Sequence, residues 1–144
     1  MLRTLTISLL FVIFFTYNAL AADVIIVNKN NPIVNISSSN LKKIYNGNAK
    51  LWDDGKKVAP VDLIDSQPSA VKFAKTILGV DMETKRRFWI EKIFAGAGTP
   101  PHQEKDDKGV ISYVASEPGA IGYIDKNSVT SAVKSVTIDG KGEF

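Results

Sequence analysis

The residues best suited to chemistry lie in the segment 63–69, which reads Leu-Ile-Asp-Ser-Gln-Pro-Ser. The segment joins a predicted strand to a predicted helix, and the first turn of a helix presents backbone N–H groups that have no partner within the helix. Because the helix dipole also favours negative charge there, such a junction suits a small anion. Ser66 and Ser69 would add hydroxyl donors. The alternative is ordinary capping, in which Asp65 or Ser66 accepts those N–H bonds.

The sequence carries no recognisable catalytic or metal-binding pattern. It has no cysteine and one histidine, His102, which excludes thiol catalysis and metal sites built from thiolates or several histidines. The acidic pairs 53–54 and 106–107 fall at a predicted turn and a predicted helix start, where turn formation and capping explain them. Nucleophile-elbow and Walker motifs are absent. We therefore expect no enzymatic activity, no cofactor and no metal.

Hydrophobic periodicity predicts the elements that must position the junction. Strands are expected at 24–28, 58–64, 120–124 and 135–138, with a short extended stretch at 33–36. Helices are expected at 39–45, from 66 to Gly79, at 83–94 and at 108–116. The expected N-caps are Ser37 or Ser38, Asp81, and Asp106 or Asp107. Strands that alternate with helices indicate an α/β fold with a mostly parallel, helix-covered sheet.

Further expectations concern packing and one loop. The helix at 83–94 is expected to turn Phe88, Trp89, Ile93 and Phe94 inward, and 96–103 is expected to be a loop because it is rich in proline and glycine. Trp52 and Trp89 are interpreted as core anchors.

The first residues have the order of a secretory signal peptide. Arg3 precedes an apolar run from Leu5 to about Phe15, and Ala19-Leu20-Ala21 is a small-x-small cleavage pattern. The run is shorter than the roughly 20 residues that a membrane-spanning helix needs, which argues against an anchor. We expect a signal peptide at 1–21, cleavage after Ala21 or Ala22, a periplasmic location, and one folded domain at 22–144.

Several motifs of the chain resemble one known family. They are Leu-Lys-Lys-Ile-Tyr-Asn-Gly at 41–47, Leu-Trp-Asp-Asp-Gly at 51–55, Phe-Trp at 88–89, Ile-Phe-Ala-Gly at 93–96 and Glu-Pro-Gly-Ala-Ile-Gly-Tyr at 117–123. In this order and spacing the chain resembles the C-terminal lobe of phosphate-type periplasmic binding proteins, the soluble receptors of ABC importers. The resemblance implies a single lobe of the type II periplasmic-binding-protein fold and a solute-binding role toward phosphate or a similar oxyanion.

The resemblance also implies which residues would hold the ligand. In phosphate-binding relatives the junction reads Arg-x-Asp-Gly-Ser-Gly-Thr, and the match assigns ligand binding to Asp65, Ser66, Gln67 and Ser69. Leu63 stands at the arginine position, which removes a bidentate partner for an oxyanion. Pro68 stands at a glycine position and lacks an N–H donor. We therefore expect weak oxyanion binding.

The length of the chain leaves its partners open. A single lobe cannot close around a ligand by hinge motion. It would bind an oxyanion weakly in an open groove, form a homodimer that rebuilds a cleft, or present itself to a periplasmic or inner-membrane protein, such as an ABC transporter component. The last arrangement corresponds to the alternative function, an interaction or sensory module without transport. The net charge of +3 is too small to indicate a nucleic-acid partner.

Overall fold

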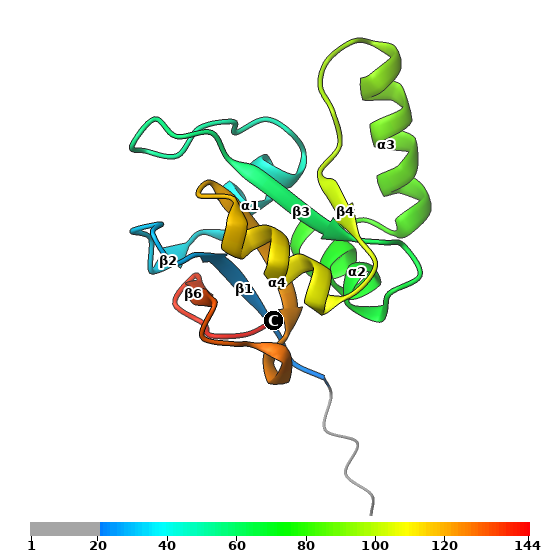
Figure 1. The fold of residues 1–144 in the computed structure, drawn as a ribbon. Helices are drawn as coiled ribbons and strands as arrows, with labels where there is room; N and C mark the ends of the chain where they lie inside the picture. The colour runs from blue at the N-terminus through cyan, green and yellow to red at the C-terminus, as the bar shows by residue number, and fades with distance from the viewer. Residues whose placement is uncertain (1–20) are drawn as a thin grey trace, which may run out of the picture.

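Strands and helices alternate along residues 21–144, the part of the chain that the computed structural model describes (Figure 1). The strands are β1 (Asp23–Asn28), β2 (Asn35–Ile36), β3 (Ala59–Leu63), β4 (His102–Glu104), β5 (Ala120–Asp125) and β6 (Val133–Ile138). The helices are α1 (Ser38–Tyr45), α2 (Pro68–Phe73), α3 (Met82–Phe94) and α4 (Asp107–Ser116), with a π-helical turn η1 (Ala74–Leu78) and a 3-10 turn η2 (Lys126–Ser128). Among these residues no helix is both long and apolar enough to cross a bilayer. The predicted signal peptide falls on residues that, apart from Ala21, lie outside the described range.

The six described strands form one mixed sheet in the order β2-β6-β1-β5-β3-β4. β1 runs antiparallel to both of its neighbours, β5 and β6, and the other three pairings are parallel. The prediction of an α/β fold with a helix-covered sheet is thereby confirmed, with one antiparallel strand at its centre. β1 is buried along its whole length, which is typical of a strand covered on both faces.

Helices cover the sheet on two sides. α4 lies across one face, and α1, α2 and η1 lie on the other (Figure 1). Gly122 on β5 makes room for α4, because a Cβ there would lie 2.7 Å from a Val110 methyl carbon. On the other face the ring of Phe73 stacks on Tyr123, with 4.2 Å between centroids and 3° between planes. One hydrophobic core therefore continues through both faces of the sheet.

Local signals set the start of three helices. The side chains of Ser37, Asp81 and Asp106 each accept a hydrogen bond from a backbone N–H three residues later, as N-caps do. Gly79 ends η1 in the left-handed conformation, with φ of 73°. The helix ends predicted from these residues are confirmed.

The prediction for the inner face of α3 was half wrong. Trp89 is buried and Phe88 is partly buried, but Ile93 is 53% exposed and Phe94 is 89% exposed. The other buried residue of α3 is Lys85. α3 lies beside β4 at the edge of the sheet, and its last turn extends beyond that strand (Figure 1). The residues of that turn therefore have no layer of the domain to pack against.

The predicted loop at 96–103 was also wrong at its end. His102 and Gln103 belong to β4, which pairs in parallel with β3 at the edge of the sheet. Pro100 and Pro101 immediately precede the strand. Proline is tolerated beside an edge strand because one side of that strand needs no ladder partner.

Candidate functional site

The predicted ligand-binding segment lies where β3 passes into α2. The turn is closed by the Gln67 N–H, which donates to the Ile64 carbonyl oxygen at 2.9 Å. Gln67 is the N-cap residue of α2, and its side chain accepts no capping bond. Pro68 is the first helical residue. The capping alternative was therefore wrong, because the N-cap is Gln67, which lies one residue after Ser66 and two after Asp65.

Leu63 does not face the junction. Its side chain is 1% exposed and belongs to the hydrophobic core. A charged guanidinium at this place would be buried, which is costly without a partner. Leu63 therefore packs in the core, and the junction has no cation at the position where phosphate-binding relatives carry arginine.

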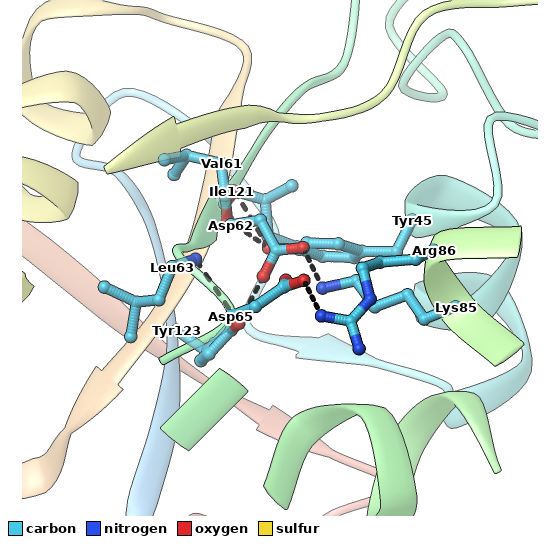
Figure 2. A network of polar contacts seen from close by, with 9 residues as sticks. All are labelled: Tyr45, Val61, Asp62, Leu63, Asp65, Lys85, Arg86, Ile121 and Tyr123. Atoms are coloured by element: carbon cyan, nitrogen blue, oxygen red, sulfur yellow. Dashed lines mark hydrogen bonds and ion pairs between the residues drawn. The ribbon is translucent and has the colours of Figure 1, made fainter. Parts of the chain in front are cut away.

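A cation nevertheless reaches the junction from another element. The guanidinium of Arg86 on α3 lies 3.4 Å from a carboxylate oxygen of Asp65 (Figure 2). Both side chains are partly exposed, so the ion pair is open to solvent. Arg86 was not identified from the sequence as a site residue. No local pattern predicts this contact, because the two partners lie 21 residues apart on separate elements.

Two other predicted ligand residues are bound to the protein itself. The Ser69 hydroxyl donates to an Asp23 carboxylate oxygen at 3.0 Å, and the Gln67 side-chain amide donates to the Lys105 carbonyl oxygen at 2.6 Å. Burial raises the pKa of Asp23, and the hydrogen bond from Ser69 and the charge of Lys72 oppose that rise. Ser66 is exposed. Of the four predicted residues, the structure thus leaves Asp65 and Ser66 open to a solute.

A buried polar network lies directly beneath the Asp65–Arg86 pair. The Asp62 carboxylate, on β3, accepts hydrogen bonds from the Lys85 ammonium and the Tyr123 hydroxyl (Figure 2). All three side chains are buried. The Tyr45 hydroxyl donates to the Val61 carbonyl oxygen at 2.8 Å. Within residues 21–144 every buried side-chain nitrogen and oxygen has a partner, so the network is fully satisfied.

The tyrosines of this network remain neutral donors. Burial and the charge of the Asp62 carboxylate both raise the pKa of Tyr123 and of Tyr45 far above the ordinary value for a phenol. Two consecutive residues of α3 thus fasten it to β3 and to the junction that follows β3. Lys85 binds Asp62 in the interior, and Arg86 binds Asp65 at the surface. The pairing fixes where the guanidinium of Arg86 stands relative to the junction.

The two ion pairs line a pocket of about 360 Å³ between α3 and the edge of the sheet. On the far side of Trp89 lies a larger open groove of about 700 Å³, at the start of β3. His102, on the rim of that groove, stacks on Tyr113 and contacts a Glu104 carboxylate oxygen at 2.7 Å. In the described part of the chain, no three His, Asp or Glu side chains gather as metal ligands would.

Solved structures of similar fold include phosphate receptors. An ABC-type phosphate transport receptor from Vibrio cholerae superposes with a TM-score of 0.67 and 21% sequence identity, over 83% of this chain and 47% of that one. PstS from Borrelia burgdorferi gives a TM-score of 0.65 and 21% identity, over 84% of this chain and 48% of that one. The chain thus spans about half the length of the structures it matches. At this identity the likeness concerns the fold.

A comparison at the level of families extends along nearly the whole chain. The family model described as a PBP superfamily domain matches residues 13–142. That range contains the sheet, the helices and the junction between β3 and α2. The chain therefore belongs to the family of periplasmic-binding-protein (PBP) superfamily domains.

Proposed function

We propose that the chain is an extracytoplasmic solute-binding domain that takes phosphate or a similar small oxyanion, weakly, at the junction between β3 and α2. The observation that carries the proposal is the guanidinium of Arg86 beside Asp65 at the start of α2. It supplies from α3 the cation that the junction itself lacks. The structural relative from Vibrio cholerae is a phosphate transport receptor, which supports the same class of solute.

The chemistry at this place favours an oxyanion that carries a proton. A guanidinium has five N–H donors, and the single contact to Asp65 leaves others for the oxygens of a ligand. The Asp65 carboxylate is an acceptor and would repel a fully deprotonated dianion. Phosphate keeps a proton near neutral pH and can donate it to Asp65, whereas sulfate cannot. We therefore expect phosphate to bind better than sulfate.

The expected affinity is low for three structural reasons. The side chains of Gln67 and Ser69 are already bonded to Lys105 and Asp23. Pro68 has no N–H to donate. The Asp65–Arg86 pair is open to solvent, where charged contacts contribute little. We expect a dissociation constant no tighter than about 100 μM, or roughly −5.5 kcal/mol.

Calorimetric titration with phosphate tests the site through two neighbouring arginines. Arg86→Ala should weaken phosphate binding about three- to tenfold, because it removes the only cation bonded to Asp65 in the described residues. Arg87→Ala is the matched control, since Arg87 is also exposed on α3 and pairs with Glu83 instead. A submicromolar affinity in the unchanged chain, or equal affinities in the two variants, would place the contacts elsewhere.

One observation favours the second function, an interaction or sensory module that retained the lobe. Of the four side chains assigned to the ligand, those of Gln67 and Ser69 form hydrogen bonds within the protein itself. Under this reading the partner is an inner-membrane or periplasmic protein, such as an ABC transporter component, or a second copy of the chain. Absence of any heat with phosphate, sulfate and molybdate at millimolar concentration would favour it over the solute-binding reading.

Export is part of the proposal. The signal pattern at 1–21 ends directly before β1, which begins at Asp23. Cleavage there would leave the buried strand intact. N-terminal sequencing of the exported protein should therefore return Ala22 or Asp23 as the first residue, and a mature chain that starts at Met1 would contradict export by this signal.

A further inference from the structure

The groove of about 700 Å³ beside Trp89, hereafter the Trp89 groove, is separate from the proposed oxyanion site. Its wall includes Ala59 and Pro60, at the start of β3, whereas the junction follows the end of that strand. The side chains of Trp89 and Tyr113 and the two prolines 100 and 101 make most of its surface apolar. Its volume is within the range of about 300–1,000 Å³ that is typical of ligand sites.

Apolar surface continues outward from this groove. Leu51, on its wall, is 60% exposed, and on α3 Ile90 is 55%, Ile93 53% and Phe94 89% exposed. Trp89 and the two prolines line both the groove and the neighbouring pocket that contains Ile90 and Ile93. The groove and the pocket lined by Ile90 and Ile93 therefore adjoin at Trp89. A small molecule in the groove would leave Ile90, Ile93 and Phe94 exposed, whereas another protein would cover them.

Among the described residues, the lysines that line the groove have no acidic partner, and the nearby Glu104 carboxylate contacts His102 at the rim instead. Lys50 and Lys57 line the groove, and no aspartate or glutamate does. Neither lysine belongs to an ion pair within residues 21–144. The acidic groups of the neighbouring pocket, by contrast, are paired with Lys85 and Arg86. A partner with a complementary surface would therefore place carboxylates beside these two lysines.

The same charges disfavour a second copy of the chain. A two-fold dimer places the same patch on both sides of its interface, so it would bring Lys50 and Lys57 of both copies into one interface without a lining carboxylate. Like charges opposed across an interface are unfavourable. We propose that the Trp89 groove docks an acidic amphipathic segment of another protein, with apolar side chains against Trp89 and carboxylates near the two lysines.

Binding of a designed peptide tests this docking site. The probe is a short synthetic peptide with leucine and phenylalanine on one face and glutamate on the other. One control peptide replaces each glutamate by lysine, and a second replaces each leucine and phenylalanine by serine. Each peptide is titrated into the mature chain, and binding is measured by calorimetry and by tryptophan fluorescence. Both control peptides should bind at least about tenfold more weakly than the probe.

Charge reversal provides a matched pair of variants. Lys50→Glu with Lys57→Glu should weaken binding of the probe about tenfold or more. Lys29→Glu with Lys141→Glu makes the same change in net charge at two exposed lysines that do not line the groove, and should leave binding nearly unchanged. Thermal melts of both variants verify that they fold. Equal loss in the two variants, or no binding of the probe at millimolar concentration, overturns the proposal.

Two further measurements distinguish other occupants. Sedimentation of the chain alone should give a monomer, and a dimer that Leu51→Ser dissociates would put a second copy in the groove and overturn the proposal. Calorimetry with decanoate, a small apolar carboxylate, should give no heat. Binding of decanoate without binding of the peptide would assign the groove to a small molecule and also overturn it. Phosphate titration is independent of all these outcomes, since Arg86 lies outside the Trp89 groove.

Discussion

Gly119→Ala should lower the free energy of unfolding by about 3 kcal/mol or more, at the upper end of the effects of overpacking. A Cβ at this position would lie 1.8 Å from the Lys57 carbonyl oxygen, and a backbone atom cannot move aside as a flexible side chain can. The Gly119 carbonyl oxygen also accepts from the Ala59 N–H at 2.9 Å and from the Trp52 indole at 3.0 Å. Relieving the clash would therefore disturb the start of β3.

The measurement is a thermal melt or a denaturant titration, in which about 3 kcal/mol corresponds to a drop in Tm of roughly 10 °C for a domain of this size. Gly142→Ala is the matched control, because no atom lies within 4 Å of a Cβ placed there. It should change stability by less than about 0.5 kcal/mol. Equal melting temperatures for the two variants would contradict the close approach of Gly119 to Lys57.

Lys85→Met should cost about 3 kcal/mol, because it leaves the buried Asp62 carboxylate without its cation. The Tyr123 hydroxyl would still donate to Asp62, but a neutral donor does not compensate a buried charge fully. The double variant Asp62→Leu with Lys85→Met should be less destabilised than the sum of the two single variants. The reason is that removing both charges leaves no unpaired ion in the interior.

Denaturant unfolding of the four chains in this cycle measures the coupling between Asp62 and Lys85. Arg87→Met serves as the control on the same helix, and it should cost less than about 0.5 kcal/mol because Arg87 is exposed. A cost below about 1 kcal/mol for Lys85→Met would mean that the ion pair does not hold α3 to β3.

Elements governed by local signals were predictable from the sequence. The starts of three helices could be predicted from Ser37, Asp81 and Asp106, because an N-cap needs only a side-chain acceptor and an N–H three residues later. β1 was predictable because a run of apolar β-branched residues is typical of a strand buried on both faces. Such features depend on neighbours in the chain and hardly on tertiary contacts.

The orientation of α3 was not predictable in the same way. Its apolar periodicity suggests that Ile93 and Phe94 pack inward, but a charged residue, Lys85, takes a place in the interior. Lys85 does so because Asp62, 23 residues earlier in the chain, is buried there to receive it. A long-range ion pair thus decides which residues of α3 meet the sheet, and hydrophobic pattern alone contains no information about it.

The candidate site shows the same division. The position of the junction between a strand and a helix followed from sequence, and Asp65 lies where it was expected. Arg86 was missed because its contact with Asp65 depends on how α3 lies against β3. The bonds of Ser69 to Asp23 and of Gln67 to Lys105 were equally hidden, since each joins residues far apart in the chain.

The most direct test of oxyanion binding at the junction is an NMR titration of the isotope-labelled mature chain with phosphate up to about 10 mM, a range that saturates a site of roughly 100 μM. Binding at the junction should give progressive, saturable shifts of the backbone amide signals of Asp65, Ser66 and Ser69 and of the Arg86 side-chain Nε–H signal. Those signals should move little with sulfate. Shifts confined to residues of the Trp89 groove, or no shifts at the highest phosphate concentration, would contradict it.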